Sequence, residues 1–386
     1  MENYDVVVIG AGVLGLSAGY SIARQGARVL ILDKGRVGYE ASSRAMGFQS
    51  LRGENPPEIP LAAVANDLWH TLDEELGYPT EWTPSGRLWV ALNDEELADF
   101  RRTAALWQSH QLPVRMIDAA EVRELVPALT DRVVGGLFTE RGGHANPQRT
   151  TQAFGWACRD RGGIIRELTP ALGIEVRQDR VVGVRTTAGI VGAKSVVICA
   201  GPQTPLLAKS IGIDVPLVAA RLEACITAPV PPLFSTAMVA NGLSVRQTGR
   251  GNILFCGGPH EWVDVDLTSE PAKPTSAIVQ GEARRLLELL PNLKSVPLLR
   301  TWAGIVEVSP DHACILERAK APEGLIIASA SGHGIGLAPA LGRVIGELAL
   351  GAAPSIPVES LSLDRFASLS SDWASERRWV AGEYNT

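Results

Sequence analysis

Two groups of glycines, far apart in the chain, have the spacing of loops that bind anionic ligands. Gly10, Gly12 and Gly15 form a GxGxxG pattern directly after the apolar run 4–9, and residues 332–337 read GHGIGL directly before a second apolar run. Glycine lets the backbone turn tightly and approach a ligand closely, and the N–H groups that open a following helix attract negative charge. Both loops are therefore candidates for holding phosphate or another anion.

A carboxylate lies where a dinucleotide-binding unit needs one. Asp33 stands in the apolar segment ARVLILDKG (27–35), 21 residues after Gly12. In βαβ units of this kind, an acid at the end of the second strand binds a ribose hydroxyl. The pattern predicts a strand over 4–9, a helix over 13–25 and a second strand before Asp33. We therefore expect this unit to bind a dinucleotide, but the pattern alone does not distinguish NAD from FAD.

The composition favours small-molecule chemistry. Of the 386 residues, 46% are hydrophobic, and the net charge is −6 without any cluster of lysine and arginine, which argues against nucleic acid or an anionic membrane as a partner. The five cysteines are scattered and form no CxxC pair, so we expect no metal site and a reduced, cytoplasmic protein. No apolar run is long enough for a transmembrane segment, and glycines interrupt the first one, unlike a secretory signal.

Hydrophobic periodicity predicts the elements that must position these residues. Helices are expected over 60–76, 94–110, a segment that begins near Pro147, 276–290 and 337–350. Extended segments are expected over 86–92, 298–305 and 323–332, as three strands within 164–200, and as short antiparallel segments within 215–258. The fold class is therefore α/β, with a Rossmann-like domain and a second α+β domain built on a largely antiparallel sheet.

Five segments in a fixed order extend this interpretation. Residues 5–35, 142–165, 181–207, 302–316 and 324–351 resemble the FAD-dependent D-amino acid oxidase superfamily, in the branch of glycine oxidase, sarcosine oxidase β chains and opine or proline dehydrogenase β chains. The resemblance implies a glutathione-reductase-type FAD-binding domain. It also implies oxidation of the C–N bond of a small amine or amino acid, by hydride transfer to flavin N5, to an imine that water hydrolyses.

The resemblance also implies which residues hold FAD. Carried over by position, they are Gly10, Gly12, Val13, Leu14, Gly15, Asp33, Lys34, Ser42, Ser43, Arg44, Gly47, Phe48, Ala171, Gly201, Gly304, Gly332, His333, Gly334, Ile335, Gly336 and Leu337. The first five would hold the pyrophosphate, and Asp33 the adenosine ribose. The loop 332–337 would present a helix N-terminus to the pyrimidine edge of the isoalloxazine.

Three residues are candidates for the reaction itself. Arg52 lies where sarcosine oxidases carry an arginine for the substrate carboxylate, and Arg246 alternates with Ser244 on a predicted strand of the second domain. A guanidinium group binds a carboxylate through two parallel hydrogen bonds. His333 could polarise the flavin or contact the substrate. The competing interpretations are a solvated loop arginine at position 52 and a histidine that bonds a neighbouring carbonyl.

Three positions depart from the resembled enzymes. Val306 stands where glycine oxidases carry an arginine, and Phe255 lies near the position of the oxygen-activating lysine of monomeric sarcosine oxidase. Pro147 stands where the β chains carry a flavin-linked histidine, so we expect non-covalent FAD. The electron acceptor is accordingly O2 or another acceptor.

The resemblance divides the chain by function. We expect an FAD-binding domain from 1–85, 145–205 and 300–355, a substrate domain from 86–144 and 206–299, and a C-terminal extension over 356–386. The molecule could form a homo-oligomer or bind a partner subunit, as the β chain of an opine, proline or hydroxyproline dehydrogenase. Oxidation of a 2-hydroxy acid, or flavin binding without turnover, would also be compatible with the same fold.

Overall fold

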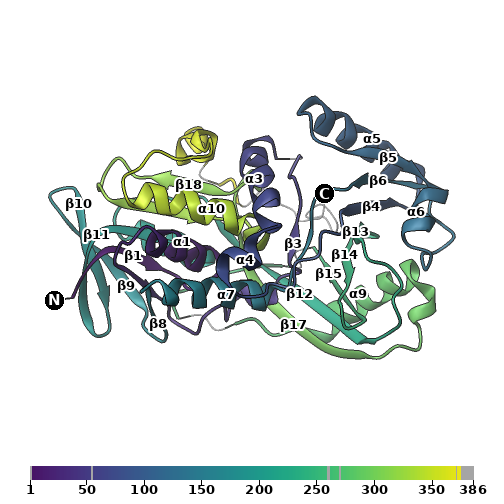
Figure 1. The fold of residues 1–386 in the computed structure, drawn as a ribbon, viewed down its shortest axis with the longest axis horizontal. Coiled ribbons are helices and arrows are strands. Elements are labelled where there is room, and N and C mark those ends of the chain that lie inside the picture. Colours follow the sequence, from purple (N-terminus) through teal and green to yellow (C-terminus); the bar gives the residue numbers. More distant parts are fainter. Residues whose placement is uncertain (1, 54, 259–260, 269–270, 371, 375–386) are drawn as a thin grey trace.

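Two β-sheets lie side by side in the computed structural model, which describes residues 2–53, 55–258, 261–268, 271–370 and 372–374 (Figure 1). The first sheet runs in the order β18-β19-β11-β1-β2-β8, and the β9–β10 hairpin extends it from β11. Its strands are β1 (Asn3–Ile9), β2 (Val29–Leu32), β8 (Ile164–Arg166), β9 (Ala171–Arg177), β10 (Arg180–Thr186), β11 (Gly189–Ile198), β18 (Ile315–Arg318) and β19 (Leu325–Ser329). The pairings β19–β11, β11–β1, β1–β2 and β2–β8 are parallel.

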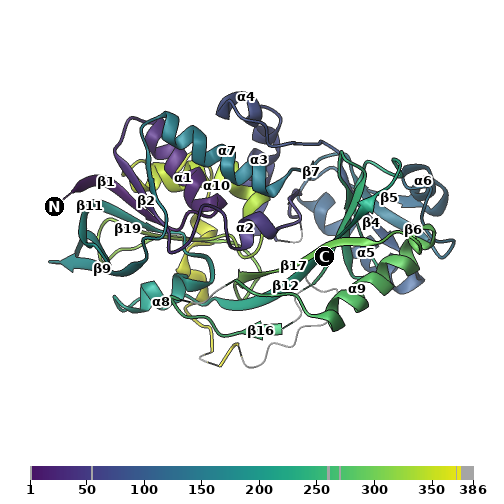
Figure 2. The same ribbon diagram turned by 90° about the horizontal axis from the view of Figure 1, so that it is seen from below.

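The central strands of the first sheet are buried on both faces, which explains their unbroken apolar sequences. Val6 and Val8 pack against helices α1 (Val13–Arg24), α7 (Pro147–Asp160) and α10 (Gly334–Ala349). The alternate residues Val7 and Ile9 pack into a core that includes residues of β9, β10 and α8 (Thr204–Lys209). Figure 2 shows the three helices on one side of the sheet and α8 on the other.

The second sheet runs in the order β16-β12-β15-β14-β13-β4-β6-β5, with β17 along β12. Its strands are β4 (Arg87–Ala91), β5 (Arg115–Asp118), β6 (Gly135–Thr139), β12 (Val218–Pro229), β13 (Ala237–Ala240), β14 (Leu243–Gln247), β15 (Asn252–Gly257), β16 (Glu261–Val263) and β17 (Leu298–Val308). The pairing is antiparallel except between β13 and β4. Helices α5 (Asp94–Ser109), α6 (Ala119–Leu125) and α9 (Ser276–Leu289) pack on it.

Short elements connect the two sheets. They are α2 (Ala41–Arg44), the pair β3 (Phe48–Gln49) and β7 (Gly143–His144), η1 (Pro56–Glu58), α3 (Ile59–Trp69), α4 (Leu72–Leu76), η2 (Gly201–Gln203), α8 (Thr204–Lys209), η3 (Pro291–Leu293), η4 (Glu359–Leu361) and η5 (Leu363–Phe366). Among the described residues, no helix has both the length and the hydropathy that crossing a bilayer requires.

The predicted fold class is confirmed, and three elements differ from their predicted form. The helix expected over 60–76 is divided into α3 and α4. Strand β9 was not predicted, because Leu172 and Val176 are exposed while Gly173 is buried, which hides the alternation. Helix α10 begins at Gly334 rather than at 337, because its first turn contains glycines that carry no apolar signal.

Two parts of the chain contact regions outside their predicted assignment. Strand β17 pairs along β12 in the second sheet, so the predicted boundary at residue 300 falls inside a strand of that sheet. In the C-terminal extension, Ile356, Val358 and Leu361 are buried in the same cluster as α1 and α10. Residues 375–386 of this extension lie outside the described part of the chain.

Candidate cofactor and substrate site

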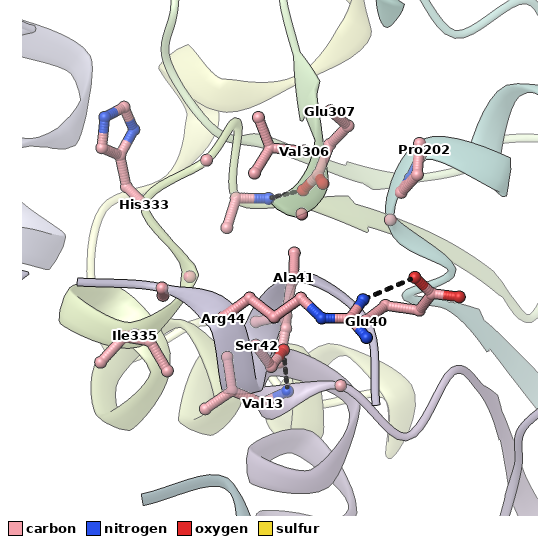
Figure 3. A pocket seen from close by; sticks show the side chains of 18 of the residues that line it. Val13, Glu40, Ala41, Ser42, Arg44, Pro202, Val306, Glu307, His333 and Ile335 are labelled. Carbon is pink, nitrogen blue, oxygen red and sulfur yellow. Dashed lines mark hydrogen bonds and ion pairs between the residues drawn. The ribbon is translucent and has the colours of Figure 1, made fainter. Parts of the chain in front are cut away.

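A long cavity opens at the carboxyl ends of the parallel strands, where α/β proteins bind ligands, and it reaches the second sheet. On the first-sheet side its lining includes Ile9, residues 12–14, Asp33, Ala200, Pro202, Ala328 and Ala330. On the second-sheet side it includes Arg87, Trp89, residues 222–224, Ser244, Cys256, Gly257, Trp302 and Val306. Figure 3 shows Val306 and Glu307 on one side of the cavity and Val13, Ser42 and Arg44 on the other.

The first glycine loop turns from β1 into α1 with almost no free space. Gly10 has a φ of +111°, and a Cβ placed on it would lie 2.2 Å from the carbonyl oxygen of Cys199. A Cβ on Gly15 would lie 2.0 Å from the carbonyl oxygen of Gly10. The backbone N–H of Val13 donates to the Ser42 hydroxyl at 2.9 Å, which joins the loop to α2. The N-terminus of α1 lies at the cavity, because residues 12–14 are part of its lining.

Asp33 follows β2 at the edge of the same cavity. Its two carboxylate oxygens accept hydrogen bonds from the backbone N–H groups of Ala11 at 2.6 Å and Gly35 at 2.7 Å. Burial raises the pKa of Asp33, and these two hydrogen bonds oppose that rise. Each carboxylate oxygen has a further lone pair, so Asp33 can still accept a ribose hydroxyl.

The second glycine loop, between β19 and α10, lies beside the first. A Cβ on Gly334 would lie 3.3 Å from a methyl group of Val13, and one on Gly336 would lie 2.8 Å from the carbonyl oxygen of Phe48. Helix α10 packs along α1, where the Ser17 hydroxyl donates to the carbonyl of Ala338 at 2.5 Å. The structure therefore brings the two distant loops together, with both helix N-termini at one cavity.

Most residues that the resemblance assigned to FAD line this cavity. They are Gly10, Gly12, Val13, Leu14, Asp33, Lys34, Ser42, Arg44, Gly47, Phe48, Ala171, Gly201, Gly304, Gly332, His333, Gly334, Ile335, Gly336 and Leu337. Gly15 and Ser43 are not in the lining. Gly15 packs beneath Gly10, and the backbone N–H of Ser43 donates to the carbonyl of Gly38. Two helix N-termini, the carboxylate of Asp33 and side-chain-free backbone along an elongated cavity fit the shape and charge of FAD.

Arg52 lines the cavity and is held from behind by a buried acid. Its Nε donates to Glu58 Oε2 at 2.9 Å, and Glu58 Oε1 accepts the backbone N–H of Cys314 at 2.6 Å. Arg52 has a φ of +57°, an unusual backbone conformation for a residue with a Cβ. The ion pair and the strained backbone fix the position of this guanidinium group at the cavity wall.

Arg87, at the start of β4, is a cavity residue that the sequence analysis did not identify. Its guanidinium carbon lies 4.4 Å from the ring centre of Phe48 and 5.4 Å from that of Trp89. Its side chain is buried and lines the cavity together with Trp89. The available signal was an arginine inside the apolar strand GRLWVAL, two residues from Trp89 and therefore on the same face.

His333 is the N-cap residue of α10 and lines the cavity. Burial, followed by the positive charges of Arg52, His312 and Arg87, holds the pKa of His333 well below its usual value. The imidazole is therefore neutral near pH 7. A neutral imidazole can accept a proton or a hydrogen bond but adds no positive charge to the site.

Arg246 is not in the lining of the cavity. Its Nε donates to the carbonyl of Met46 at 2.8 Å, and its Nη1 lies 3.5 Å from His144 Nδ1. The geometry does not support the predicted contact with a substrate carboxylate, because the side chain is directed to the segment 44–48. Its neighbour Ser244, on the same face of β14, does line the cavity.

The three residues that differ from the resembled enzymes lie in different parts of the structure. Val306 lines the cavity, so an apolar side chain stands where an arginine was possible. Phe255 is fully buried in the core of the second sheet, whereas the adjacent Cys256 lines the cavity. Pro147 is the first residue of α7.

Comparison with known proteins identifies the family of the chain. A family model described as FAD dependent oxidoreductase (DAO) matches residues 5–348. The chain belongs to this family. It is therefore an FAD-dependent oxidoreductase, and the cavity that joins the two glycine loops is the place that fits its cofactor.

The chain is similar to several members of the DAO family along most of its length. It is 28% identical to glycine oxidase of Geobacillus kaustophilus over 90% of this chain and 93% of that enzyme. It is 27% identical to sarcosine oxidase subunit beta of Rhodobacter capsulatus over 82% of this chain and 78% of that subunit. The crystal structure of L-proline dehydrogenase from P. horikoshii superimposes with a TM-score of 0.86 at 26% identity, covering 95% of this chain and 98% of the other.

Proposed function

We propose that the protein oxidises the C–N bond of a small amine or amino acid that carries a carboxylate. The observation that supports this most directly is that Arg52 and Arg87, from separate elements, line the same cavity as His333 and the second glycine loop. The names of the similar enzymes, glycine oxidase and L-proline dehydrogenase, agree with an amino-acid substrate.

Each of these side chains has a task in the proposed reaction. Arg52, oriented by Glu58, and Arg87, stacked on Phe48, bind the carboxylate through charge-assisted hydrogen bonds. His333, as neutral imidazole, accepts a hydrogen bond from the substrate amine. The apolar wall at Val306 keeps water from the reacting carbon. FAD, when bound, would supply the hydride acceptor, and water would hydrolyse the imine product after its release.

The two sheets would divide this work. The first sheet, with α1 and α10, would hold FAD, and the second sheet would supply substrate contacts through Arg87 and its neighbours. Residues of the C-terminal extension would support the FAD-binding part, because Ile356, Val358 and Leu361 pack into its core.

Anaerobic reduction of the bound flavin tests the proposed function. The purified holoenzyme is mixed without oxygen with glycine, sarcosine, L-proline, other D- and L-amino acids, their decarboxylated amines and 2-hydroxy acids, and flavin absorbance is followed. Bleaching by an amino acid, with its decarboxylated counterpart at least about tenfold weaker, is expected from the loss of a charge-assisted contact. If no amine bleaches the flavin, or if a 2-hydroxy acid does so best, the proposal is wrong.

Transfer of electrons to an acceptor other than O2 is a second candidate. Phe255 is buried in the second core and brings no positive charge near the cavity, and one similar protein is a subunit, sarcosine oxidase subunit beta. Admitting air after the anaerobic reduction distinguishes the two acceptors. Fast reoxidation with peroxide indicates an oxidase, whereas slow reoxidation that a dye accelerates indicates a dehydrogenase or a chain that works with a partner subunit.

A further inference from the structure

Glu307, near the end of β17, is a buried acid on the cavity wall that the sequence analysis assigned no role in the site. Its Oε1 accepts hydrogen bonds from the Ser329 hydroxyl at 3.2 Å and from the backbone N–H of Ala330 at 3.3 Å. Its Oε2 lies 3.5 Å from a Cβ placed on Gly201, and no other residue in the described part of the chain forms a hydrogen bond with Oε2. One carboxyl oxygen is thus tied to the protein, while the other faces the cavity lining.

The strand order shows which part of the cavity Glu307 faces. Strand β1 leads into the first glycine loop, β19 leads into the second, and β11 lies between them in the sheet. Glu307 contacts the end of β19 at Ala330 and lies beside Gly201, just beyond the end of β11. Figure 3 shows its carboxyl group across the cavity from Ala41 and Ser42. Glu307 therefore lies between the loop suited to the pyrophosphate and the loop suited to the flavin ring.

The covalent structure of FAD specifies what must occupy this stretch. The ribityl chain joins the pyrophosphate to the isoalloxazine, and its hydroxyl groups can each donate and accept a hydrogen bond. We propose that Glu307 is a cofactor-binding residue that hydrogen-bonds a ribityl hydroxyl of FAD through Oε2, as a neutral carboxylic acid. This proposal rests on the family's cofactor alone and is independent of the substrate proposed above.

The surroundings favour the neutral acid. Burial raises the pKa of Glu307, and the hydrogen bonds from its own backbone N–H, from Ser329 and from Ala330 only partly oppose that rise. Arg44, on the facing α2 segment, forms an ion pair with Glu40, with 3.7 Å between Arg44 Nη1 and Glu40 Oε2. The pyrophosphate of FAD would bring further negative charge into the cavity. A protonated Oε2 satisfies a ribityl hydroxyl without leaving an unpaired buried charge.

Three variants separate cofactor binding from a purely structural role. Glu307→Leu removes both oxygens, Glu307→Gln mimics the neutral acid, and Ser329→Ala removes a bond to Oε1 while leaving Oε2 in place. The dissociation constant is measured by fluorescence for FAD and for an FAD analogue whose ribityl chain is replaced by a hydroxyl-free alkyl chain. Thermal unfolding of each apoprotein checks that it is folded.

The expected pattern is specific to the ribityl hydroxyls. Glu307→Leu should weaken FAD binding by about three- to tenfold, the loss of one neutral hydrogen bond. It should leave the affinity for the hydroxyl-free analogue unchanged, whereas Glu307→Gln and Ser329→Ala should bind FAD within about twofold of wild type. The proposal fails if Glu307→Leu binds FAD like wild type, or if FAD and the analogue lose affinity equally. A Gln variant as weak as the Leu variant would contradict the neutral acid.

Infrared spectroscopy keeps the proposal testable even if the leucine variant does not fold. The holoenzyme should show a protonated carboxyl C=O band that is absent from Glu307→Gln, and this band should shift when FAD is replaced by the hydroxyl-free analogue. A band that is missing, or that does not respond to the exchange of cofactor, overturns the assignment. Because neither readout involves substrate, failure here leaves the proposed amine oxidation untouched.

Discussion

At the scale of single residues, the substrate end of the cavity is defined by how its cations are held. Arg52 is oriented by the buried Glu58, and Arg87 is oriented by the rings of Phe48 and Trp89. A guanidinium group can stack on an aromatic ring with its face and bind a planar carboxylate with its edge. Arg87 is therefore the residue whose substitution should report most directly on recognition of the carboxylate.

Replacing Arg87 with leucine should weaken binding of the carboxylated substrate by roughly 10- to 100-fold, the loss of a charge-assisted hydrogen bond. The decarboxylated amine should bind equally well to both proteins. Titrating the anaerobic flavin reduction rate against substrate concentration measures the effect. Arg102→Leu on the exposed surface of α5 is the matched control. Equal losses for both ligands would show that Arg87 does not recognise the carboxylate.

A second prediction concerns His144, which is buried beside Arg246. Burial, followed by the charge of Arg246, lowers the pKa of His144 to about 3. The unfolded chain binds a proton near pH 6.5 and the folded chain does not, so stability is lost as the pH falls from about 6.5 towards 3. The slope from this one group is at most about 1.4 kcal/mol per pH unit.

Urea unfolding of wild type and His144→Asn across this pH range tests the prediction. The variant should lose less stability on acidification than wild type, because asparagine does not titrate. Parallel pH dependences in the two proteins would mean that His144 is not held neutral in the folded state.

Some residues of the cavity can be identified from the sequence, and others cannot. Spacing alone identified Gly10, Gly12 and Asp33, because the turn, the close approach and the acid each require one residue type. Arg87 was not identified from the sequence, because its neighbours along the strand are apolar. Only the fold shows that β4 borders the cavity. Arg246 was placed on the correct strand, but its partner Met46 is distant in sequence, so its direction could not be predicted.

At the scale of elements, the contact between α1 and α10 determines how the two glycine loops meet. A Cβ on Gly342 would lie 1.8 Å from the Ser17 hydroxyl oxygen and 2.7 Å from the Ser17 backbone carbonyl carbon. A Cβ on Gly346 would lie 2.5 Å from the Ser21 hydroxyl oxygen. The helices therefore approach each other through small residues. Ser17 meets Gly342 and Ser21 meets Gly346, so residue numbers rise in the same direction along both helices, which are parallel.

Gly342→Ala should lower the free energy of unfolding by about 1–3 kcal/mol, since the added methyl group forces the helices apart. It should also weaken FAD binding. The control is Gly281→Ala in α9, where a Cβ meets nothing within 4 Å. This control should raise stability by about 0.5–1 kcal/mol through helix propensity. Chemical denaturation of both variants gives the comparison, and a stabilised Gly342→Ala would refute the packing argument.

Element boundaries were predictable where amphipathic or continuous apolar patterns were long, as for α5, α7 and α9. The predicted boundaries were wrong where an element consists largely of small or solvent-exposed residues. The start of α10 was missed because glycines replace the apolar residues of its first turn, and β9 because Leu172 and Val176 face solvent.

At the scale of the whole molecule, the second sheet fixes part of the cavity lining. Arg246 Nε donates to the carbonyl of Met46, and the Trp302 indole donates to the carbonyl of Arg44 at 2.9 Å. Both bonds fix the segment 44–48, which lines the cavity beside the first sheet. We therefore expect binding of FAD to be coupled to the relative placement of the sheets, which no local sequence pattern could show.

FAD should stabilise the entire fold. At a free concentration of 100 times its dissociation constant, it should raise the free energy of unfolding by about 2.7 kcal/mol. Gly10→Ala, which would place a methyl group 2.2 Å from the Cys199 carbonyl oxygen, should remove this gain. Denaturant unfolding of apoprotein and holoprotein measures both effects. An FAD-independent midpoint for the wild type would contradict the assignment of the cavity.

The parallel packing of α1 and α10 also affects the electrostatics of the cofactor-free protein. Side by side, the two helices point their positive ends at the same space, and those ends repel each other until an anion arrives. Without a bound anion, the close packing of Gly342 on Ser17 and the hydrogen bond from Ser17 to Ala338 must offset this repulsion. An anionic cofactor bound at this place would offset the repulsion between the two helix N-termini.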